Sequence, residues 1–298
     1  MTRIMKSAGA LVLAGVLLAG CGTGPAEVDS AAIIGKDSVP LAGFQHEITR
    51  LIDTKQAAKQ VQRQRTMDQA ARNLLTIRVQ HRIVRDVAAR EHLSVDQGFV
   101  NRQMSVPGLD KFLETQVLDR AGFAGYQADL SLMMDLARKQ ADRLTVRADI
   151  VGGLDPAQAR ELAANIARQP AKGGDLMRTA SPDAELNQTL RPAEGVPTTV
   201  FSGTPGSVLA FPAGGQDARW YVVRVLSRDQ GQPSQGQDRL SLDALAGVGR
   251  ALLVPDAQRI GVRINPRFGA WDDYTLSVVP SGAEKRVLAF PSSAGPGA

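Results

Sequence analysis

Few side chains in this 298-residue sequence have the types and spacing that chemistry requires. Cys21 is the only cysteine, so the chain has neither an internal disulfide nor a Cys-x-x-Cys site. Three histidines, His46, His81 and His92, have no partners at metal-ligand spacing, which argues against a zinc site. The sequence contains no nucleophile elbow, phosphate-binding loop or dinucleotide fingerprint. We therefore expect no metal, cofactor or nucleotide, and Cys21 has the best-defined chemistry.

The residues before Cys21 have the pattern of a secretion signal. Arg3 and Lys6 give a positive start, and an apolar run extends from Ala8 to Gly20. These thirteen residues, rising about 1.5 Å each, are too short to cross a hydrocarbon layer of roughly 30 Å. Residues 1–20 are therefore predicted to be a signal peptide.

The end of this signal, Leu18-Ala19-Gly20-Cys21, resembles the lipobox of bacterial lipoproteins. The resemblance implies cleavage before Cys21, a diacylglyceryl group on its thiol and a further acyl chain, such as palmitate, on its amine. It also implies a lipid anchor on the extracytoplasmic face of the plasma membrane. Residues 21–30 are small and polar and are interpreted as a tether. The alternative is an ordinary cleaved signal with a coincidental cysteine.

The composition limits the possible partners. The full chain has a formal net charge of +5, and removal of Arg3 and Lys6 with the signal leaves +3. This charge is too small to indicate nucleic-acid binding. An aromatic content of 4% supplies few rings that could stack on bases or sugars, whereas 43% hydrophobic residues are sufficient for a core. The length predicts one extended multi-part body or two domains.

The strongest structural signal is the stretch from Thr66 to Leu93, which contains no Gly or Pro. It predicts a long helix with a broad apolar arc, and the rest of the chain is expected to pack around it. The arc consists of Leu74, Ile77, Val79, Ile83, Val84, Val87 and Ala88. A basic row on the other side consists of Arg78, Arg82 and Arg85. Such a row is usually a solvated face; the alternative is a surface for anionic lipid head groups or acidic client segments.

Shorter elements are predicted on both sides of the long helix. The expected order is a strand at 31–34, a turn at 35–37, a helix at 41–54, a capped helix start at 94–97, and helices at 108–118 and 126–144. Gly122 and Gly125 are expected to separate the last two helices.

This order resembles the N-terminal chaperone region of SurA-type foldases from about Ala31 to Leu144. The segments AAIIGKDSVPLAGF and REHLSVDQ carry the resemblance, although Gly35 lacks the usual preceding Asn and Gln97-Gly98 replaces the usual acidic step. It implies a helical domain, residues 31–145, that binds unfolded or newly secreted polypeptides in an apolar trough beside Arg78. The predicted client-groove residues are Phe112, Leu130, Met133 and Met134. Core packing is the alternative for the two methionines.

Residues 146–229 resemble a parvulin-type prolyl isomerase domain. Arg147–Ile150 would be its first strand, Asp155 would cap a helix at Pro156–Arg168, and GSVLAFPAGGQDARWYVVRV would supply its last two strands. The family's two histidines are missing, because Ala148 or Asp149 and Trp220 or Tyr221 occupy their positions. The resemblance therefore implies the fold without the isomerase activity.

Residues 230–288 predict a linker, a helix at Asp243–Leu253 and a strand from Ile260 that enters a turn at Asn265-Pro266. This ending is similar to that of secreted SurA-domain lipoproteins of high-GC bacteria. We expect the strand to pair with residues 31–34 and Trp271 to enter the core. The alternative is that Arg267 and Trp271 hold a partner. Residues 289–298 are predicted to be disordered.

The sequence thus predicts an α+β, mainly helical protein with a SurA-N-like helical region, a small degenerate parvulin-like α/β domain and disordered termini. It resembles SurA/PrsA-type extracytoplasmic foldase lipoproteins of high-GC Gram-positive bacteria. The resemblance implies a membrane-anchored chaperone-like protein, not an enzyme, with unfolded or secreted polypeptides as partners and no nucleic acid or nucleotide. The alternatives are an active prolyl isomerase and a non-catalytic envelope scaffold with one dedicated partner.

Overall fold

The computed structural model describes residues 27–54, 67–194, 196–213, 219–232, 240–282 and 287–291. Cys21 and the predicted signal peptide lie outside the described residues, so lipid attachment stays a prediction. Of the predicted tether, Glu27–Asp29 forms a short 3₁₀ turn and Ser30 opens the first strand. Within the described ranges, no helix is both long and apolar enough to cross a membrane.

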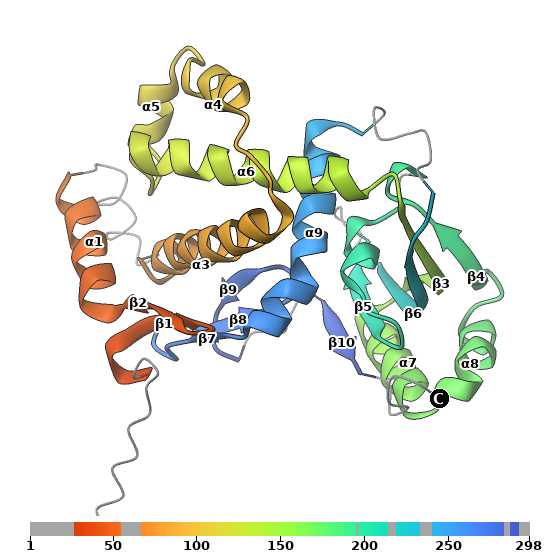
Figure 1. Ribbon diagram of the computed structural model, residues 1–298. Helices are drawn as coiled ribbons and strands as arrows, with labels where there is room; N and C mark the ends of the chain where they lie inside the picture. Colours follow the sequence, from red (N-terminus) through yellow and green to blue (C-terminus); the bar gives the residue numbers. More distant parts are fainter. Residues whose placement is uncertain are drawn as a thin grey trace, which may run out of the picture.

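The fold is α+β and mainly helical, as predicted (Figure 1). The helices are α1 (Leu41–Thr54), α3 (Met67–Glu91), α4 (Gln97–Met104), α5 (Leu109–Glu114), α6 (Arg120–Gln140), α7 (Pro156–Arg168), α8 (Gly173–Ala180) and α9 (Leu242–Ile260). The strands are β1 (Ser30–Ile34), β2 (Asp37–Pro40), β3 (Leu144–Leu154), β4 (Glu185–Leu190), β5 (Val208–Pro212), β6 (Trp220–Gln230), β7 (Val262–Ile264), β8 (Ala270–Asp272), β9 (Ser277–Val279) and β10 (Leu288–Phe290). In Figure 1, α9 lies between a helical body that contains α1 and α3–α6 and a sheet covered by α7 and α8.

The long helix predicted from Thr66 to Leu93 is α3. Every predicted arc residue except Ile77 is buried along it, which confirms the apolar arc. The helix ends at His92, which adopts a left-handed conformation with φ 53°. The Leu93 N–H then donates to the Ala88 carbonyl at 2.9 Å, which is the pattern of a Schellman C-cap. His92 therefore has a structural role as a helix terminator.

The first two strands pair with the strand that follows α9 in a three-stranded sheet with the order β2-β1-β7. A tight turn at Gly35, with φ 59°, joins β1 to β2. On the other side of β1, Ala32 is paired antiparallel with Ile264, so the predicted pairing with the C-terminal strand is confirmed. Trp271 on β8 is also buried, at 6% exposure, as predicted.

The second sheet has five antiparallel strands in the order β10-β5-β6-β3-β4. The first strand, the helix Pro156–Arg168 and the last two strands of the parvulin-like region are all present where the sequence predicts them. Asp155 caps α7 together with Gln158 in a capping box. The edge strand β10 corrects the prediction of a disordered tail from residue 289, because Ala289 and Phe290 pair with β5.

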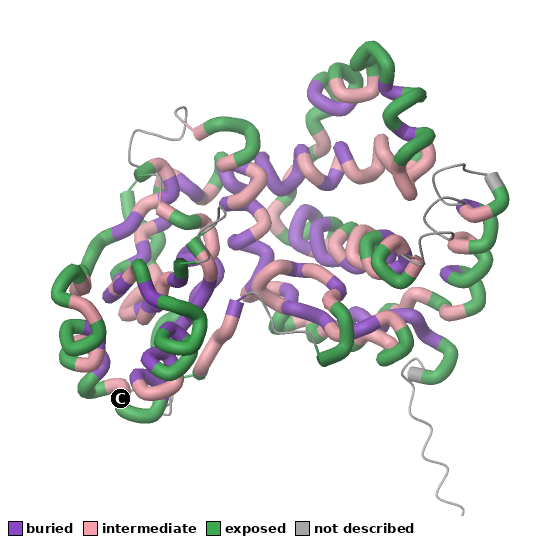
Figure 2. The backbone as a smooth tube through the Cα atoms, turned by 180° about the vertical axis from the view of Figure 1, so that it is seen from behind, coloured by how far each residue is buried: buried purple, intermediate pink, exposed green. Residues whose placement is uncertain are grey.

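One hydrophobic core extends through both parts of the molecule. It includes Val84 on α3, Met134 on α6, Leu252 on α9 and Val225 on β6. A second core lies between the other face of the large sheet and α7 and α8. The predicted domain boundary at residue 145 falls inside β3, between Leu144 and Val146, which are both fully buried in the first core. Figure 2 shows that the arm formed by α4 and α5, by contrast, carries mostly exposed and intermediate residues.

Two predicted helix boundaries are wrong for identifiable reasons. Gly122 and Gly125 do not separate two helices, because α6 already begins at Arg120. The Asp119 carboxylate accepts the Gly122 N–H at 2.7 Å and caps the helix there. Similarly, α9 continues past the predicted end at Leu253 and through Pro255, since tertiary packing of its apolar side outweighs the local cost of an interior proline.

Candidate functional site

A groove of about 330 Å³ opens between α1, α3 and α6 beside Arg78. We call it the α1–α3–α6 groove. Its apolar lining consists of Leu51, Ile77, Val117, Leu118, Ala121 and Tyr126. Leu51, Ile77, Ala121 and Tyr126 lie on α1, α3 and α6, which are amphipathic helices with inner faces in the core. Val117 and Leu118 lie in the loop that precedes α6.

A smaller, entirely apolar depression continues from this groove. It is lined by Ile48, Leu51, Ile52, Met67, Ala70, Ala71, Leu74 and Val117. Leu51 and Val117 line both hollows, so the apolar surface is continuous between them. This continuous apolar surface can contact apolar side chains of another molecule.

The rim of the groove carries paired charges. Arg78 on α3 is hydrogen-bonded to Glu47 on α1. Arg50 Nη2 lies 3.4 Å from Asp119 Oδ2 across the opening. His81 Nδ1 lies 2.7 Å from Oδ2 of Asp129, whose side chain is 7% exposed. The rim is therefore polar but close to neutral, which favours binding through the apolar floor over binding of a highly charged ligand.

The arginines of the predicted basic row form ion pairs with nearby carboxylates. In addition to the Arg78–Glu47 pair, Arg82 Nη2 lies 2.5 Å from Asp37 and 3.3 Å from Asp86. Arg85 Nε lies 3.5 Å from Asp129 Oδ1, so the two groups form an ion pair but no hydrogen bond. The row is neither simply solvated nor a free cationic surface, and lipid head groups or acidic clients would have to displace these partners.

The four predicted client-groove residues do not line this groove. Met133 and Met134 are 3% and 1% exposed and belong to the core, so the groove prediction is wrong for them and the core-packing alternative is correct. Their burial results from α9, which packs so closely that an added Cβ at Gly249 would lie 2.0 Å from the Met133 carbonyl oxygen. Leu130 is partly buried against the same core. Phe112 is 50% exposed on the α4–α5 arm, where its ring meets Phe123 at a centroid distance of 6.3 Å.

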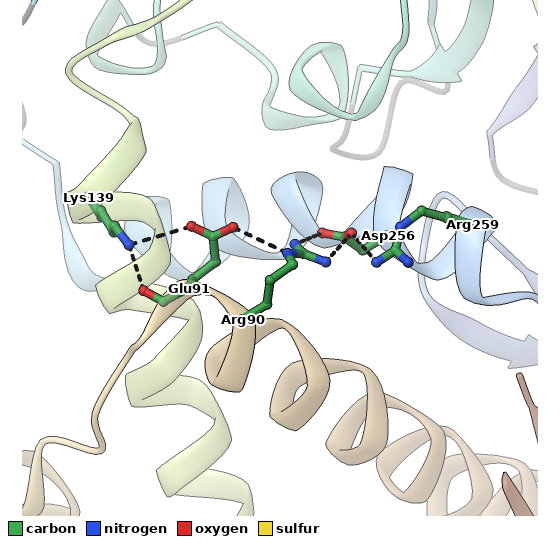
Figure 3. Close-up of polar contacts among 5 residues, drawn as sticks. All are labelled: Arg90, Glu91, Lys139, Asp256 and Arg259. Carbon is green, nitrogen blue, oxygen red and sulfur yellow. Dashed lines mark hydrogen bonds and ion pairs between the residues drawn. The ribbon is translucent and has the colours of Figure 1, made fainter. Parts of the chain in front are cut away.

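An ion network fixes the end of α3 against α6 and α9 (Figure 3). Arg90 forms two hydrogen bonds of 2.7 Å with the Asp256 carboxylate, which also accepts one of 2.9 Å from Arg259. Lys139 Nζ donates to the Glu91 carbonyl at 2.6 Å. Burial alone would raise the pKa of Asp256, but the hydrogen bonds from Arg90 and Arg259 outweigh it and lower the pKa below its ordinary value. The network thus holds the C-terminal ends of α3 and α6, which are two of the helices that line the groove.

The positions where the parvulin family has histidines have structural roles here. Asp149 is 5% exposed; its carboxylate accepts the Asn187 N–H at 2.8 Å and lies 3.5 Å from Arg224. Tyr221 packs on Phe211, with ring centroids 5.9 Å apart, and covers Gly152. Ala148 and Trp220 are buried. Asp149 is thus engaged within the fold and is not presented to a substrate.

The three histidines lie at different places in the fold. His46 is exposed on α1, His81 lies on the groove rim and His92 terminates α3. Among the described residues, no three His, Cys, Asp or Glu side chains gather closely enough to hold a metal ion. The groove is only partly predictable from the sequence. Arg78 marks it, and the spacing of Phe44, Ile48, Leu51 and Ile52 indicates an apolar face on α1. No local pattern places Val117 and Tyr126 beside that face.

Comparisons with known proteins find similar solved structures but no matching family. No protein-family profile matches the sequence, and no curated protein matches it significantly. Two solved structures of foldase proteins align along much of the chain. PrsA from Lactococcus lactis gives a TM-score of 0.29 at 12% identity over 79% of this chain and 94% of its own. PrsA from Streptococcus pneumoniae gives 0.25 at 13% identity over 70% of this chain and 91% of its own.

Proposed function

We propose that this protein is a membrane-anchored, extracytoplasmic, chaperone-like protein that binds apolar segments of unfolded or newly secreted polypeptides without catalysis. The observation that carries the proposal is the α1–α3–α6 groove with its continuous apolar floor. An extended segment with one or two large apolar side chains would bury them against Leu51 and Val117. The near-neutral rim would tolerate many client sequences.

The absence of catalysis is part of the proposal. It is supported by the burial and ion pairing of Asp149 and by the packing of Tyr221. In a proline-limited refolding assay, the protein should leave the slow phase unchanged. Acceleration that is lost on Asp149→Asn or Tyr221→Phe substitution would instead establish an active isomerase.

The groove is tested by suppression of client aggregation. The wild-type chain at equimolar ratio should suppress aggregation of an unfolded secreted protein, and Val117→Asp should abolish most of this effect, because it places a charge on the apolar floor shared by both hollows. The matched control is Leu242→Asp, at a side chain 53% exposed at the start of α9. Equal thermal transitions of both variants would establish that the loss is local. Full activity of Val117→Asp, or no suppression by the wild type, would refute the proposal.

The anchor is tested separately. Replacing Cys21 with Ala removes the thiol that the lipobox resemblance assigns to lipidation. The variant should move from the membrane fraction to the soluble fraction and lose labelling by a palmitate analogue. Retention in the membrane fraction would contradict the anchor while leaving the groove proposal intact.

A further inference from the structure

A second cavity, separate from the α1–α3–α6 groove, has a different chemical character. It measures about 640 Å³ and lies where α3, α9, the 3₁₀ turn Thr198–Ser202 and the segment around β9 meet. Its α3 residues, Gln69, Asn73 and Thr76, belong to another face of that helix than Ile77 and His81, which line the groove. Its volume lies within the range of small-molecule sites.

Hydroxyl and amide side chains dominate its lining. Thr76 Oγ1 accepts the Val278 N–H at 2.9 Å and keeps its own O–H to donate. Asn73 Oδ1 accepts from Gln69 at 2.7 Å, which leaves the Asn73 NH₂ group for another partner. Thr198 and Thr199, in the 3₁₀ turn, add two further hydroxyls. Such a lining offers many donors and acceptors to a hydroxylated ligand.

Arg250 on α9 gives the cavity its charge. Among the described residues that line the cavity it is the only charged one, so no carboxylate of the lining neutralises it. Its Nε is buried without a hydrogen-bond partner, and its guanidinium forms no hydrogen bond or ion pair with another described residue. This differs from the arginines of the groove rim and the α3–α9 network, which are all paired. A buried donor without a partner costs stability, and a bound anion is one of the partners that can satisfy it.

We propose that this cavity binds a small polyhydroxylated anion, with Arg250 as the anchor for its carboxylate or phosphate group. The guanidinium fork would form charge-assisted hydrogen bonds to two oxygens of the anion. The threonine, asparagine and glutamine side chains would bind the hydroxyl groups on the carbon skeleton of the anion. This site is independent of client binding in the groove.

Calorimetric titration of the full chain with glucose 6-phosphate, glucuronate, glucose and inorganic phosphate tests the proposal. Glucose 6-phosphate or glucuronate should bind with a Kd of about 1 mM or tighter. Arg250→Gln should weaken that binding by at least about tenfold. The control Arg267→Gln removes an equal charge from an exposed turn and should change the Kd less than about twofold. Glucose should bind more weakly because it lacks an anionic group. Inorganic phosphate should also bind more weakly because it lacks the hydroxylated carbon skeleton.

Thermal unfolding without ligand separates a ligand-binding role from a structural one. If Arg250 serves a ligand, Arg250→Gln should leave the Tm unchanged or raise it, since no intramolecular partner is lost. Absence of binding by either sugar anion up to about 10 mM, equal binding by Arg250→Gln, or a clear fall in its Tm would overturn the proposal. Equal affinity for inorganic phosphate and glucose 6-phosphate would overturn the polyhydroxylated class.

Discussion

Asp256 shows how a single carboxylate joins two helices, α3 and α9. Its side chain is 18% exposed and receives hydrogen bonds from Arg90 on α3 and Arg259 on α9. Charge-assisted hydrogen bonds at partly buried sites contribute more than exposed ion pairs do. The end of α3 is consequently fixed by a residue located far along the chain from it.

We predict that Asp256→Asn lowers the free energy of unfolding at pH 7 by about 1–3 kcal/mol, because two guanidinium groups lose their anion. The folded pKa of Asp256 lies below its ordinary value of 3.8. Its contribution is therefore fully present above that value and is lost as the pH falls through the folded pKa. Urea denaturation from pH 7 to pH 3 should show the curves of the wild type and variant converging at the acidic end.

Asp110→Asn provides the control for this experiment. Asp110 pairs with Arg120, but its side chain is 83% exposed, so the substitution should leave stability nearly unchanged. If the difference in free energy of unfolding between the wild type and Asp256→Asn stays constant down to pH 3, the proposed role of the carboxylate is contradicted.

At the same scale, the sequence could identify reactive residues but not their surroundings. Cys21 stands out because it is the only cysteine, and the lack of histidine clusters is visible directly. Whether Met133 faces a groove or the core depends on α9, which begins more than a hundred residues later. The unpaired state of Arg250 likewise depends on which elements close around it. The local sequence pattern therefore predicts neither the burial of Met133 nor the unpaired state of Arg250.

The contact between α6 and α9 decides which surfaces the helices expose. A Cβ at Gly249 would lie 2.0 Å from the Met133 carbonyl oxygen, a distance that requires the helix backbones to separate. Gly43 on α1, by contrast, has nothing within 4 Å of a built Cβ. The two positions therefore form a matched pair for testing close helix packing.

We predict that Gly249→Ala lowers the free energy of unfolding by at least about 2 kcal/mol, since the overlap is with backbone and cannot be relieved by a side-chain rotation. Gly43→Ala should raise it by about 0.5–1 kcal/mol through helix propensity. Chemical denaturation of both variants measures the difference. Equal stability of the two would show that α9 does not pack on α6 as described.

Elements with complete local signals were predictable from the sequence. The helix Pro156–Arg168 has a proline at its first turn and a capping box from Asp155, and both bounds are correct. The errors arise where packing overrides local preference. Gly122 lies inside α6 because Asp119 caps the helix before it, and Pro255 lies inside α9 because buried residues on both sides of it hold the helix.

On the scale of the whole molecule, segments far apart in the sequence pair in the sheets and pack in one core. β7 completes the sheet begun by β1, and β10 extends the sheet that β3 begins. The first core includes residues from β1 through α9 and the large sheet, so neither part buries its apolar surface alone. The sequence predicted the β1 pairing from the resemblance of its ending, but nothing local indicated that one core crosses residue 145.

We therefore predict that residues 31–145 do not fold as an independent unit. Without α9 and β3, the apolar sides of α3 and α6 would be exposed, and this surface would make the fragment molten or aggregated. Calorimetry should show no cooperative transition for the fragment and a clear one for the chain truncated after Pro291, which keeps every described element. A sharp transition for 31–145 alone would instead mean that the helical body is a separable domain. In that case the groove would not depend on the large sheet, and Val117→Asp should then impair client binding by the isolated fragment as much as by the full chain.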